Sequence, residues 1–441
     1  MSLIAVYLPA LFNRLRLPLY RNAMYILWVN SLPGILGIVF WWIASRLYSA
    51  EEIGLGAAII SAIVLVSGIA GLGTFAGVIR FLPEAKEPVH FLNSMYTLIL
   101  LSSSFAGGLY LTGIQIWTPN LLILQTNTSY MLVFMLAMLM TPLSTLVIHT
   151  FIAQRCSHYA SLFVAISNIL RLALVYFFVR QGAIGVVASI ALALLVSLAI
   201  LMYLFLPRIL PDYVYRWSWD TGIYKAVLPY SVGNYIVSLI AQLAQTLLPI
   251  MILEGSGPQA NAYAYIPLQL SFATTTFGFS LATSAFAEAA HQDAKSGNLL
   301  MRSTILGLVI SAILTFIILI GAPVFMGWFG AVYAQESTGL LRLAALAGPF
   351  MVLNQNYYTQ LRLQKRIRQL TLLSLACFTL TLGSTSLLLP RVGIEASGIG
   401  LLMGHASVSL WIFYLIRRGA GVFLCRNSRL GNEVKTISWE H

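Results

Sequence analysis

The sequence predicts an all-α integral membrane protein. It predicts twelve transmembrane helices in two pseudosymmetric six-helix lobes around a central cavity, with both termini cytoplasmic. Three observations lead to this prediction: a composition of 59% hydrophobic and 9% charged residues, a series of long apolar segments, and residues that recur at a fixed offset. A mean hydropathy of +0.86 over 441 residues excludes a soluble domain, because a soluble interior could not hide that much apolar surface.

The apolar segments are long and continuous, which favours transmembrane helices over the short alternating strands of a barrel. Each segment can cross a bilayer as one helix. The twelve predicted spans are residues 22–45, 53–79, 91–113, 130–152, 159–179, 184–206, 227–253, 262–287, 303–322, 338–361, 370–389 and 394–416.

Two residues of the first half recur in the second half at one offset. Asn30 and Glu84 return as Asn234 and Glu288, both 204 positions later. Repeated halves of this kind are typical of secondary transporters, in which the two repeats enclose the pathway. Two halves that repeat only because such a bundle packs well remain the alternative.

The longest polar connection, residues 207–226, joins the sixth span to the seventh and predicts the boundary between the lobes. The N-terminal lobe is residues 1–210, an interfacial arm plus helices 1–6. The C-terminal lobe is residues 211–441, helices 7–12 plus a basic cytoplasmic tail. On the opposite side the connections are short, and Ser49 with Glu52 predicts a capping box for the second helix.

Basic residues gather in alternate connections, which explains the net charge of +12 without a nucleic-acid partner. Arg208, Arg216 and Lys225 lie on the side with many basic residues. The opposite side carries only Arg46, Arg180 and Arg391 among its connections. The positive-inside rule therefore places both termini in the cytoplasm and the protein in the cell membrane as a multi-pass protein.

Motifs for soluble enzyme chemistry are absent from the sequence. There is no GxxxxGK[ST], HExxH, CxxC or GxSxG pattern, and the six histidines have no metal-ligand spacing. We therefore expect no catalytic residue, no metal site and no cofactor. Any pumping would have to use a gradient, and the sequence does not identify a coupling ion.

Arginines at membrane depth are candidates for a water-filled cavity, because an ionised group in the bilayer is expensive. Arg171 lies midway along the fifth span and is the clearest case, although a structural bond to facing carbonyls is the alternative. Arg46, Arg80 and Arg342 lie near span ends, where snorkelling explains an arginine cheaply. If they line the cavity instead, their forked donors suit phosphate.

Uncharged polar residues within the spans form a second set of cavity candidates. They could bind carbohydrate, or they could join helices as interhelical hydrogen bonds do in membrane bundles. Asn30 and Asn234 occupy the same point of each repeat, which predicts that they face each other across a pseudo-twofold axis. The set comprises Asn30, Asn234, Gln242, Gln245, Asn354 and Asn356.

Glu84 and Glu288 end the second and eighth helices on the predicted cytoplasmic side. Their repetition suggests an inner gate that pairs with nearby basic groups. Solvated helix ends remain the alternative for either residue alone.

The opening of the chain carries a resemblance to a known family. Arg21-Asn22, Arg46-Leu-Tyr-Ser-Ala-Glu-Glu-Ile-Gly54 and Arg80-Phe-Leu-Pro-Glu84 resemble polysaccharide biosynthesis and export proteins, oligosaccharide flippases of the O-antigen or exopolysaccharide type. These belong to the multidrug/oligosaccharidyl-lipid/polysaccharide exporter superfamily. The resemblance implies a flippase that moves a polyprenyl-diphosphate-linked oligosaccharide across the cytoplasmic membrane by alternating access. The implied partners are that substrate, membrane lipid and polysaccharide polymerase or glycosyltransferase machinery.

Two other functions stay open. A cation-coupled multidrug exporter of the same superfamily is the alternative, although such exporters commonly use a membrane-embedded acid in an early helix, and the first span has none. A membrane glycan ligase or polymerase is the third possibility, but such enzymes use a large outer loop that is absent from the prediction. We expect a transporter rather than an enzyme, and a monomer because two lobes already form a pseudosymmetric pair.

Overall fold

The computed structural model describes residues 18–211, 213–291, 296–364 and 366–417, which are helical almost throughout and contain no strand. The longer helices are α2 (Pro18–Leu47), α3 (Ala50–Ala70), α5 (Pro88–Thr112), α8 (Thr128–Ala153), α9 (Ser157–Phe177), α10 (Ala183–Ile200), α12 (Thr221–His291), α13 (Ser296–Gly327), α15 (Thr338–Leu363), α16 (Ile367–Val392) and α17 (Glu395–Arg417). The shorter helices are α4 (Thr74–Phe81), α6 (Ile114–Trp117), α7 (Ile123–Thr126), α11 (Leu206–Ile209) and α14 (Ala331–Glu336).

The predicted twelve spans are confirmed. Eight described helices are long and apolar enough to cross a membrane. The remaining four spans are α2, α15 and the two arms of α12, which are separated by the non-helical backbone of Gly257 (φ 86°, ψ 174°). The protein is therefore a multi-pass membrane protein. Its second helix also begins with the predicted capping box of Ser49 and Glu52.

The second predicted span differs from the prediction because it is two helices. α3 ends at Ala70 and α4 begins at Thr74. Between them Leu72 and Gly73 adopt left-handed backbone angles, with φ of 50° and 67°. Glycine takes that conformation without strain, so the sequence Gly71-Leu-Gly73 allows the break. A broken transmembrane helix leaves carbonyl groups unpaired and often lines a cavity.

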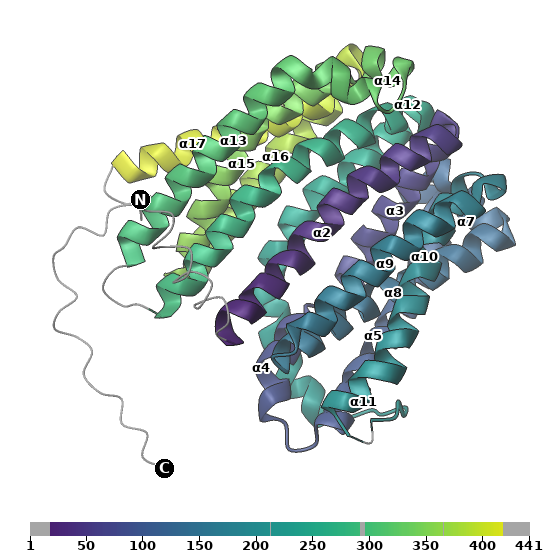
Figure 1. The fold of residues 1–441 in the computed structure, drawn as a ribbon. Helices are drawn as coiled ribbons and strands as arrows, with labels where there is room; N and C mark the ends of the chain where they lie inside the picture. Colours follow the sequence, from purple (N-terminus) through teal and green to yellow (C-terminus); the bar gives the residue numbers. More distant parts are fainter. Residues whose placement is uncertain (1–17, 212, 292–295, 365, 418–441) are drawn as a thin grey trace, which may run out of the picture.

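The helices form two groups (Figure 1). One group contains α2–α11 and the other contains α13–α17, with α12 between them. The groups meet near α14 and α7 and spread apart toward the opposite end, where α4 and α11 lie (Figure 1). The basic residues of the connections predict that this spread end faces the cytoplasm.

The first arm of α12 packs against the N-terminal group although it follows the predicted lobe boundary. Tyr224 and Val227 belong to the same buried cluster as Leu92 and Leu146. A Cβ added at Gly77 would lie 2.3 Å from Val227 Cγ1, so glycine allows α4 to contact this arm closely. The division at residue 210 remains a prediction, and α12 contacts both groups of helices.

Backbone contacts join the two groups at the end where they meet. The amide of Asn261 donates to the carbonyl of Gly54 over 2.7 Å. A Cβ at Gly54 would lie 1.6 Å from the carbonyl oxygen of Pro258, so no side chain fits there. Trp42 Nε1 and Arg46 Nη2 both donate to the carbonyl of Trp328, over 3.0 and 2.6 Å.

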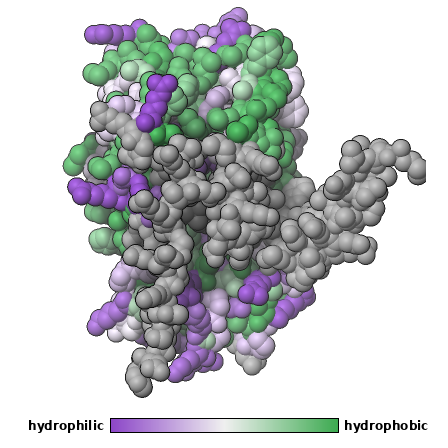
Figure 2. All heavy atoms as spheres, turned by 90° about the vertical axis from the view of Figure 1, so that its left-hand side faces the viewer, coloured by the Kyte–Doolittle hydropathy of each residue, from purple (hydrophilic) through white to green (hydrophobic). Residues whose placement is uncertain are grey.

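Apolar side chains cover the outside of both groups, as a bilayer requires. Figure 2 shows hydrophobic residues over wide areas of the surface, with hydrophilic residues in separate clusters. Phe316, Leu387 and Leu410 on α13, α16 and α17 are 63%, 76% and 69% exposed. Side chains of this kind would face lipid.

The connection that leads into α12 is fixed to the start of α5. Asp220 Oδ2 lies 3.0 Å from His90 Nε2, and its Oδ1 accepts from the N–H groups of Gly222 and Ile223 over 2.8 and 3.1 Å. One carboxylate therefore pairs with α5 and caps the N-terminus of α12.

We predict that Gly54→Ala weakens the contact between the groups, because the new methyl group overlaps the Pro258 carbonyl. Overpacking of this kind costs about 1–3 kcal/mol, and we expect the melting temperature in detergent to fall by several degrees. Gly108→Ala on α5 is the control, since a Cβ there meets nothing within 4 Å. Equal melting temperatures for both variants would contradict the prediction.

The bonds to Asp220 predict a pH dependence. The hydrogen bond from His90, and those from the Ile223 and Gly222 amides, hold the pKa of Asp220 below its ordinary value. A lowered carboxyl pKa gives stability that is complete above the unfolded pKa of about 3.9 and is lost as the pH falls through the folded pKa.

We therefore expect Asp220→Asn, which keeps a capping oxygen, to melt below the wild type at neutral pH. The difference should shrink on acidification below about pH 4. Glu87→Gln is the control for loss of an exposed carboxylate on the same side. A difference between Asp220→Asn and the wild type that stays constant down to about pH 2 would exclude a charge effect.

Candidate functional site between the two groups of helices

A cavity of about 250 Å³ lies between the N-terminal group and the second arm of α12 and contains Arg171. Its N-terminal wall comes from α2, α3, α9 and α10, and its opposite wall comes from the second arm of α12. The lining residues are Pro33, Gly34, Gly37, Ile38, Phe40, Trp41, Ile60, Arg171, Ile190, Tyr265, Gln269 and Phe272. Arg171, which the sequence predicts within the membrane core, thus lines this cavity.

Two of the three guanidinium nitrogens of Arg171 are buried without a hydrogen-bond partner. These two atoms, Nε and Nη2, contact no acceptor among the described residues. The guanidinium carbon lies 5.2 Å from the centre of the Phe40 ring, which gives a cation–π contact but satisfies no N–H group. A buried cation with unused donors favours an anionic ligand in this cavity.

The cavity is open beside Arg171 because α2 presents glycine there. A Cβ at Gly34 would meet nothing within 4 Å, and one at Gly37 would lie 3.5 Å from Arg171 Nη2. Across the cavity, the ring of Tyr265 packs edge-on against Trp41 with centroids 4.9 Å apart. Aromatic groups and a glycine face therefore enclose the guanidinium with apolar surface.

Acidic side chains do not line this cavity or the other cavities found in the described part of the chain. The described glutamates and aspartate lie at helix ends or in connections, as Glu52, Asp220 and Glu254 do. Within the described part of the chain, the Arg171 cavity therefore has no carboxylate that would attract a cationic ligand or neutralise Arg171.

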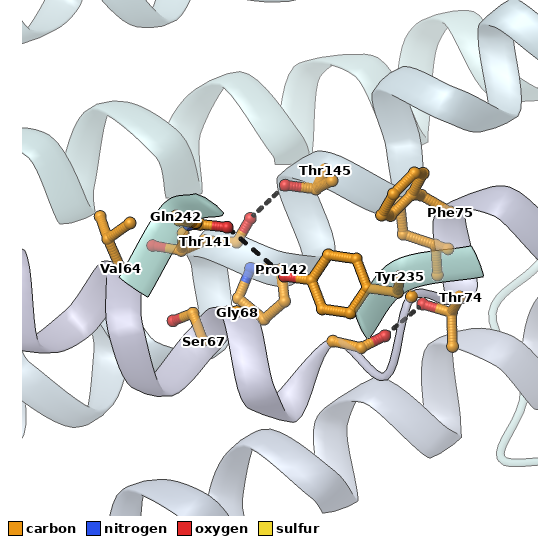
Figure 3. Close-up of a pocket in the computed structure, with 13 residues that line it drawn as sticks. Val64, Ser67, Gly68, Thr74, Phe75, Thr141, Pro142, Thr145, Tyr235 and Gln242 are labelled. Carbon is orange, nitrogen blue, oxygen red and sulfur yellow. Dashed lines mark hydrogen bonds between the residues drawn. The ribbon is translucent and has the colours of Figure 1, made fainter. Parts of the chain in front are cut away.

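A second cavity, of about 290 Å³, adjoins the break between α3 and α4 (Figure 3). Hydroxyl groups line it, and they donate to neighbours within the protein. Thr74 donates to the Gly71 carbonyl over 2.9 Å and Thr141 to the Ala137 carbonyl over 2.8 Å. Tyr235 of α12 donates to Gln242 Oε1 over 3.5 Å across the same space (Figure 3).

A third cavity, of about 80 Å³, lies in the C-terminal group against α12. The Asn354 amide donates to the His405 carbonyl over 3.0 Å, and Asn354 Oδ1 accepts from Ser409 over 2.8 Å. Cys377 Sγ lies 3.6 Å from His405 Nδ1. Gln245 contributes to the lining from the first arm of α12.

Helix α12 lines all three cavities. Tyr235 and Gln242 face the second, Gln245 faces the third, and Phe272 lines both the first and the third. A movement of α12 would therefore change the shape of each cavity at once.

Three predicted arginines lie away from the Arg171 cavity. Arg46 is exposed and donates to Trp328 where the groups meet. Arg80 is exposed and pairs with Glu84 over 2.7 Å within one helical turn. Arg342 is exposed and donates to the Leu319 carbonyl over 3.0 Å. These contacts fit the snorkelling and helix-end positions that were the favoured interpretation of the three arginines, and their role in a substrate cavity remains a prediction.

The predicted polar residues divide among several positions. Gln242, Gln245 and Asn354 line the second and third cavities, whereas Asn356 is buried and donates to the Val352 carbonyl of its own helix over 2.8 Å. The side chains of Asn30, Asn234 and Glu288 lie outside the described part of the structure. Their predicted facing pair and gate remain predictions.

Sequence reasoning missed Tyr265, Gln269 and His405. The first two are four residues apart on one face of α12, and a search for helical spacing would have found them. His405 had no such signal, because its neighbours Asn354 and Cys377 come from two other helices.

Comparisons with known proteins give a fold and no sequence family. No protein-family model and no curated protein matches the chain. A solved structure described as the inward-facing conformation of a multidrug resistance MATE family transporter of the MOP superfamily is similar, with a TM-score of 0.69, 13% identity and coverage of 92% of this chain and 96% of that chain. The chain has the MATE transporter fold.

Two other MATE structures are also similar. The outward-facing conformation of a MATE family transporter gives a TM-score of 0.61 at 13% identity, with coverage of 91% and 95%. A MATE crystal structure in complex with MaL6 gives 0.58 at 14% identity, with coverage of 91% and 96%.

The unpaired guanidinium predicts opposite effects on stability and on binding. Arg171→Met removes a buried cation and keeps the bulk, so we expect a melting temperature at least as high as that of the wild type. Inorganic diphosphate should raise the melting temperature of the wild type, by about 2.7 kcal/mol of stabilisation at a hundredfold excess over Kd, and should not affect the variant.

Arg391→Met is the matched control, because Arg391 is an exposed arginine at the end of α16. It should keep the response to diphosphate. A response of equal size in all three proteins would show that the ion binds elsewhere.

Proposed function

We propose that this protein is a membrane transporter that works by alternating access. The MATE fold, the contact between the groups at one end and the cavities at their interface support this proposal. In such a mechanism, the contact near Gly54 would open as the cytoplasmic end closes, and α12 would move between the lobes.

The substrate that the cavity favours is an amphiphile with an anionic group. This proposal rests on Arg171, a buried cation that has two unpaired donor atoms and no carboxylate among the described residues of its cavity. Arginine binds diphosphate oxygens through paired donors. We therefore propose the lipid-linked oligosaccharide that the opening sequence resembles as the first substrate, flipped outward for cell-surface polysaccharide synthesis.

A multidrug exporter is the second candidate, and the structural comparisons favour it. The similar structures are described as multidrug resistance MATE transporters. The cavity chemistry is less suited to a cationic drug, because a cation would approach Arg171 without a compensating acid.

The third possibility, a membrane enzyme, has no support in the fold or in the cavities. The monomeric state and the polysaccharide polymerase or glycosyltransferase partners remain proposals.

We expect reconstituted protein to move a fluorescent polyprenyl-diphosphate oligosaccharide from one leaflet of a liposome to the other. Arg171→Ala should slow this movement about tenfold or more at equal incorporation, because charge-assisted hydrogen bonds contribute about 1.5–3 kcal/mol. Arg391→Ala should keep the wild-type rate.

The same liposomes, with and without a proton or sodium gradient, decide between the candidates. Flipping of the labelled lipid in either condition supports the flippase and reports whether a gradient is needed. An absence of flipping, together with gradient-driven efflux of a cationic dye, would assign the protein as a drug exporter.

A further inference from the structure

A fourth cavity lies within the N-terminal group and shares no lining residue with the three cavities that α12 lines. Its volume is about 470 Å³. Its walls come from α5, α8, α10 and the connection that leads toward α12. A volume of this size lies within the range of about 300–1,000 Å³ that is usual for small-molecule sites.

Most of the cavity wall is hydrocarbon. Leu100, Leu143, Leu195, Leu198 and Met202 supply large apolar side chains from three helices. A wall of this kind accepts an apolar chain and offers nothing to a sugar or an ion.

Four tyrosines provide the polar part of the same wall: Tyr96, Tyr203, Tyr213 and Tyr215. Tyr96 and Tyr213 are 1% and 7% exposed. Thr150 donates to the Leu146 carbonyl over 2.9 Å, which leaves its hydroxyl oxygen free to accept from Tyr96. The Tyr213 hydroxyl is buried and has no partner among the described residues, and such a donor is costly unless a ligand accepts from it.

The phenol of Tyr213 stays protonated. Burial raises the pKa of Tyr213, and the neighbouring Tyr96, Tyr215 and Tyr203 raise it further. A neutral phenol donates a hydrogen bond, so Tyr213 suits a ligand with acceptor oxygens.

The surroundings place the cavity at the boundary between lipid and water. Trp217 and Trp219 in the adjoining connection are 63% and 56% exposed, and Tyr203 is 81% exposed. Arg208 stacks on the ring of Phe205 at 4.9 Å. Exposed tryptophan and tyrosine beside arginine are typical of a membrane interface.

The helix is distorted where it forms this wall. Residues Leu201–Phe205 form a π-helix between α10 and α11, and Met202 and Tyr203 of this segment line the cavity. Such π-helical turns are rare and are frequently found at functional sites.

We propose that this cavity binds one acyl chain of a glycerophospholipid from the cytoplasmic leaflet, with the Tyr213 hydroxyl donating to an oxygen of its ester or phosphate group. The apolar wall takes the chain and the Tyr213 phenol takes the polar end. Because the cavity includes the connection that ends at Asp220, bound lipid would also hold the segment that leads into α12. This site is independent of the proposed transport substrate.

The test is photolabelling in nanodiscs of phosphatidylethanolamine and phosphatidylglycerol that contain a small fraction of phospholipid with a diazirine on one acyl chain. We expect labelled peptides from α5, α8 and the 210–216 connection. Ala199→Phe fills the cavity and should reduce this labelling about tenfold. Ala173→Phe, the same change at an exposed position of α9, should leave it unchanged.

Tyr213→Phe is a second variant that keeps the bulk of the side chain and removes one donor. A hydrogen bond of about 1 kcal/mol corresponds to a roughly fivefold decrease in labelling. If Ala199→Phe does not fold, the labelling of Tyr213→Phe tests the proposed lipid site instead.

Labelling of these peptides that is equal in the wild type, Ala199→Phe and Tyr213→Phe would overturn the proposal. In a competition experiment, polyprenyl phosphate is added at the same mole fraction as the diazirine phospholipid. If it abolishes the labelling, the occupant is an isoprenoid and the phospholipid assignment is wrong.

Discussion

The close approach of two backbones at Gly54 is the constraint on which the arrangement of the two groups depends. The carbonyl of Pro258 occupies the space that any side chain at position 54 would need, and the Asn261 amide bonds to the Gly54 carbonyl. The turn of α12 is thereby fixed to α3 at one end of the molecule. With this end joined, the remaining freedom of the two groups lies at the other end, where they spread apart.

Helix α12 transmits this constraint to the cavities. Its turn is held at the joined end, its first arm packs on α4 through Gly77, and its start is capped by Asp220 beside His90. Between these points its side chains line the cavities at the interface. Helix α12 therefore contacts both groups and contributes to the wall of each of these cavities.

The electrostatics of the interface follow from Arg171. The bilayer makes an unpaired cation expensive, and no carboxylate among the described residues lines the cavity to neutralise Arg171. The apolar enclosure by Phe40, Trp41 and Tyr265 lowers the local dielectric, so an anionic group bound there would interact more strongly than in water.

Much of the architecture was predictable because the bilayer imposes it. A helix of about twenty apolar residues is the solution for a chain with this composition, so the spans, the capping box at Ser49 and the two lobes followed from the sequence. The break at Gly71-Leu-Gly73 was not predicted, because the apolar run continues through it and the left-handed backbone depends on the neighbouring helices.

For the site, the sequence by itself determined which residues are expensive in a membrane, and Arg171 was found on that basis. Only the tertiary structure decided which polar groups share a cavity. Arg46, Arg80 and Arg342 find carbonyl or carboxylate partners, whereas Tyr265 and Gln269 come to Arg171 from a helix almost a hundred residues away. The physical reason is that the free-energy cost of burying a polar group depends on the residue type, which the sequence gives. The group that it bonds to depends on how the helices pack.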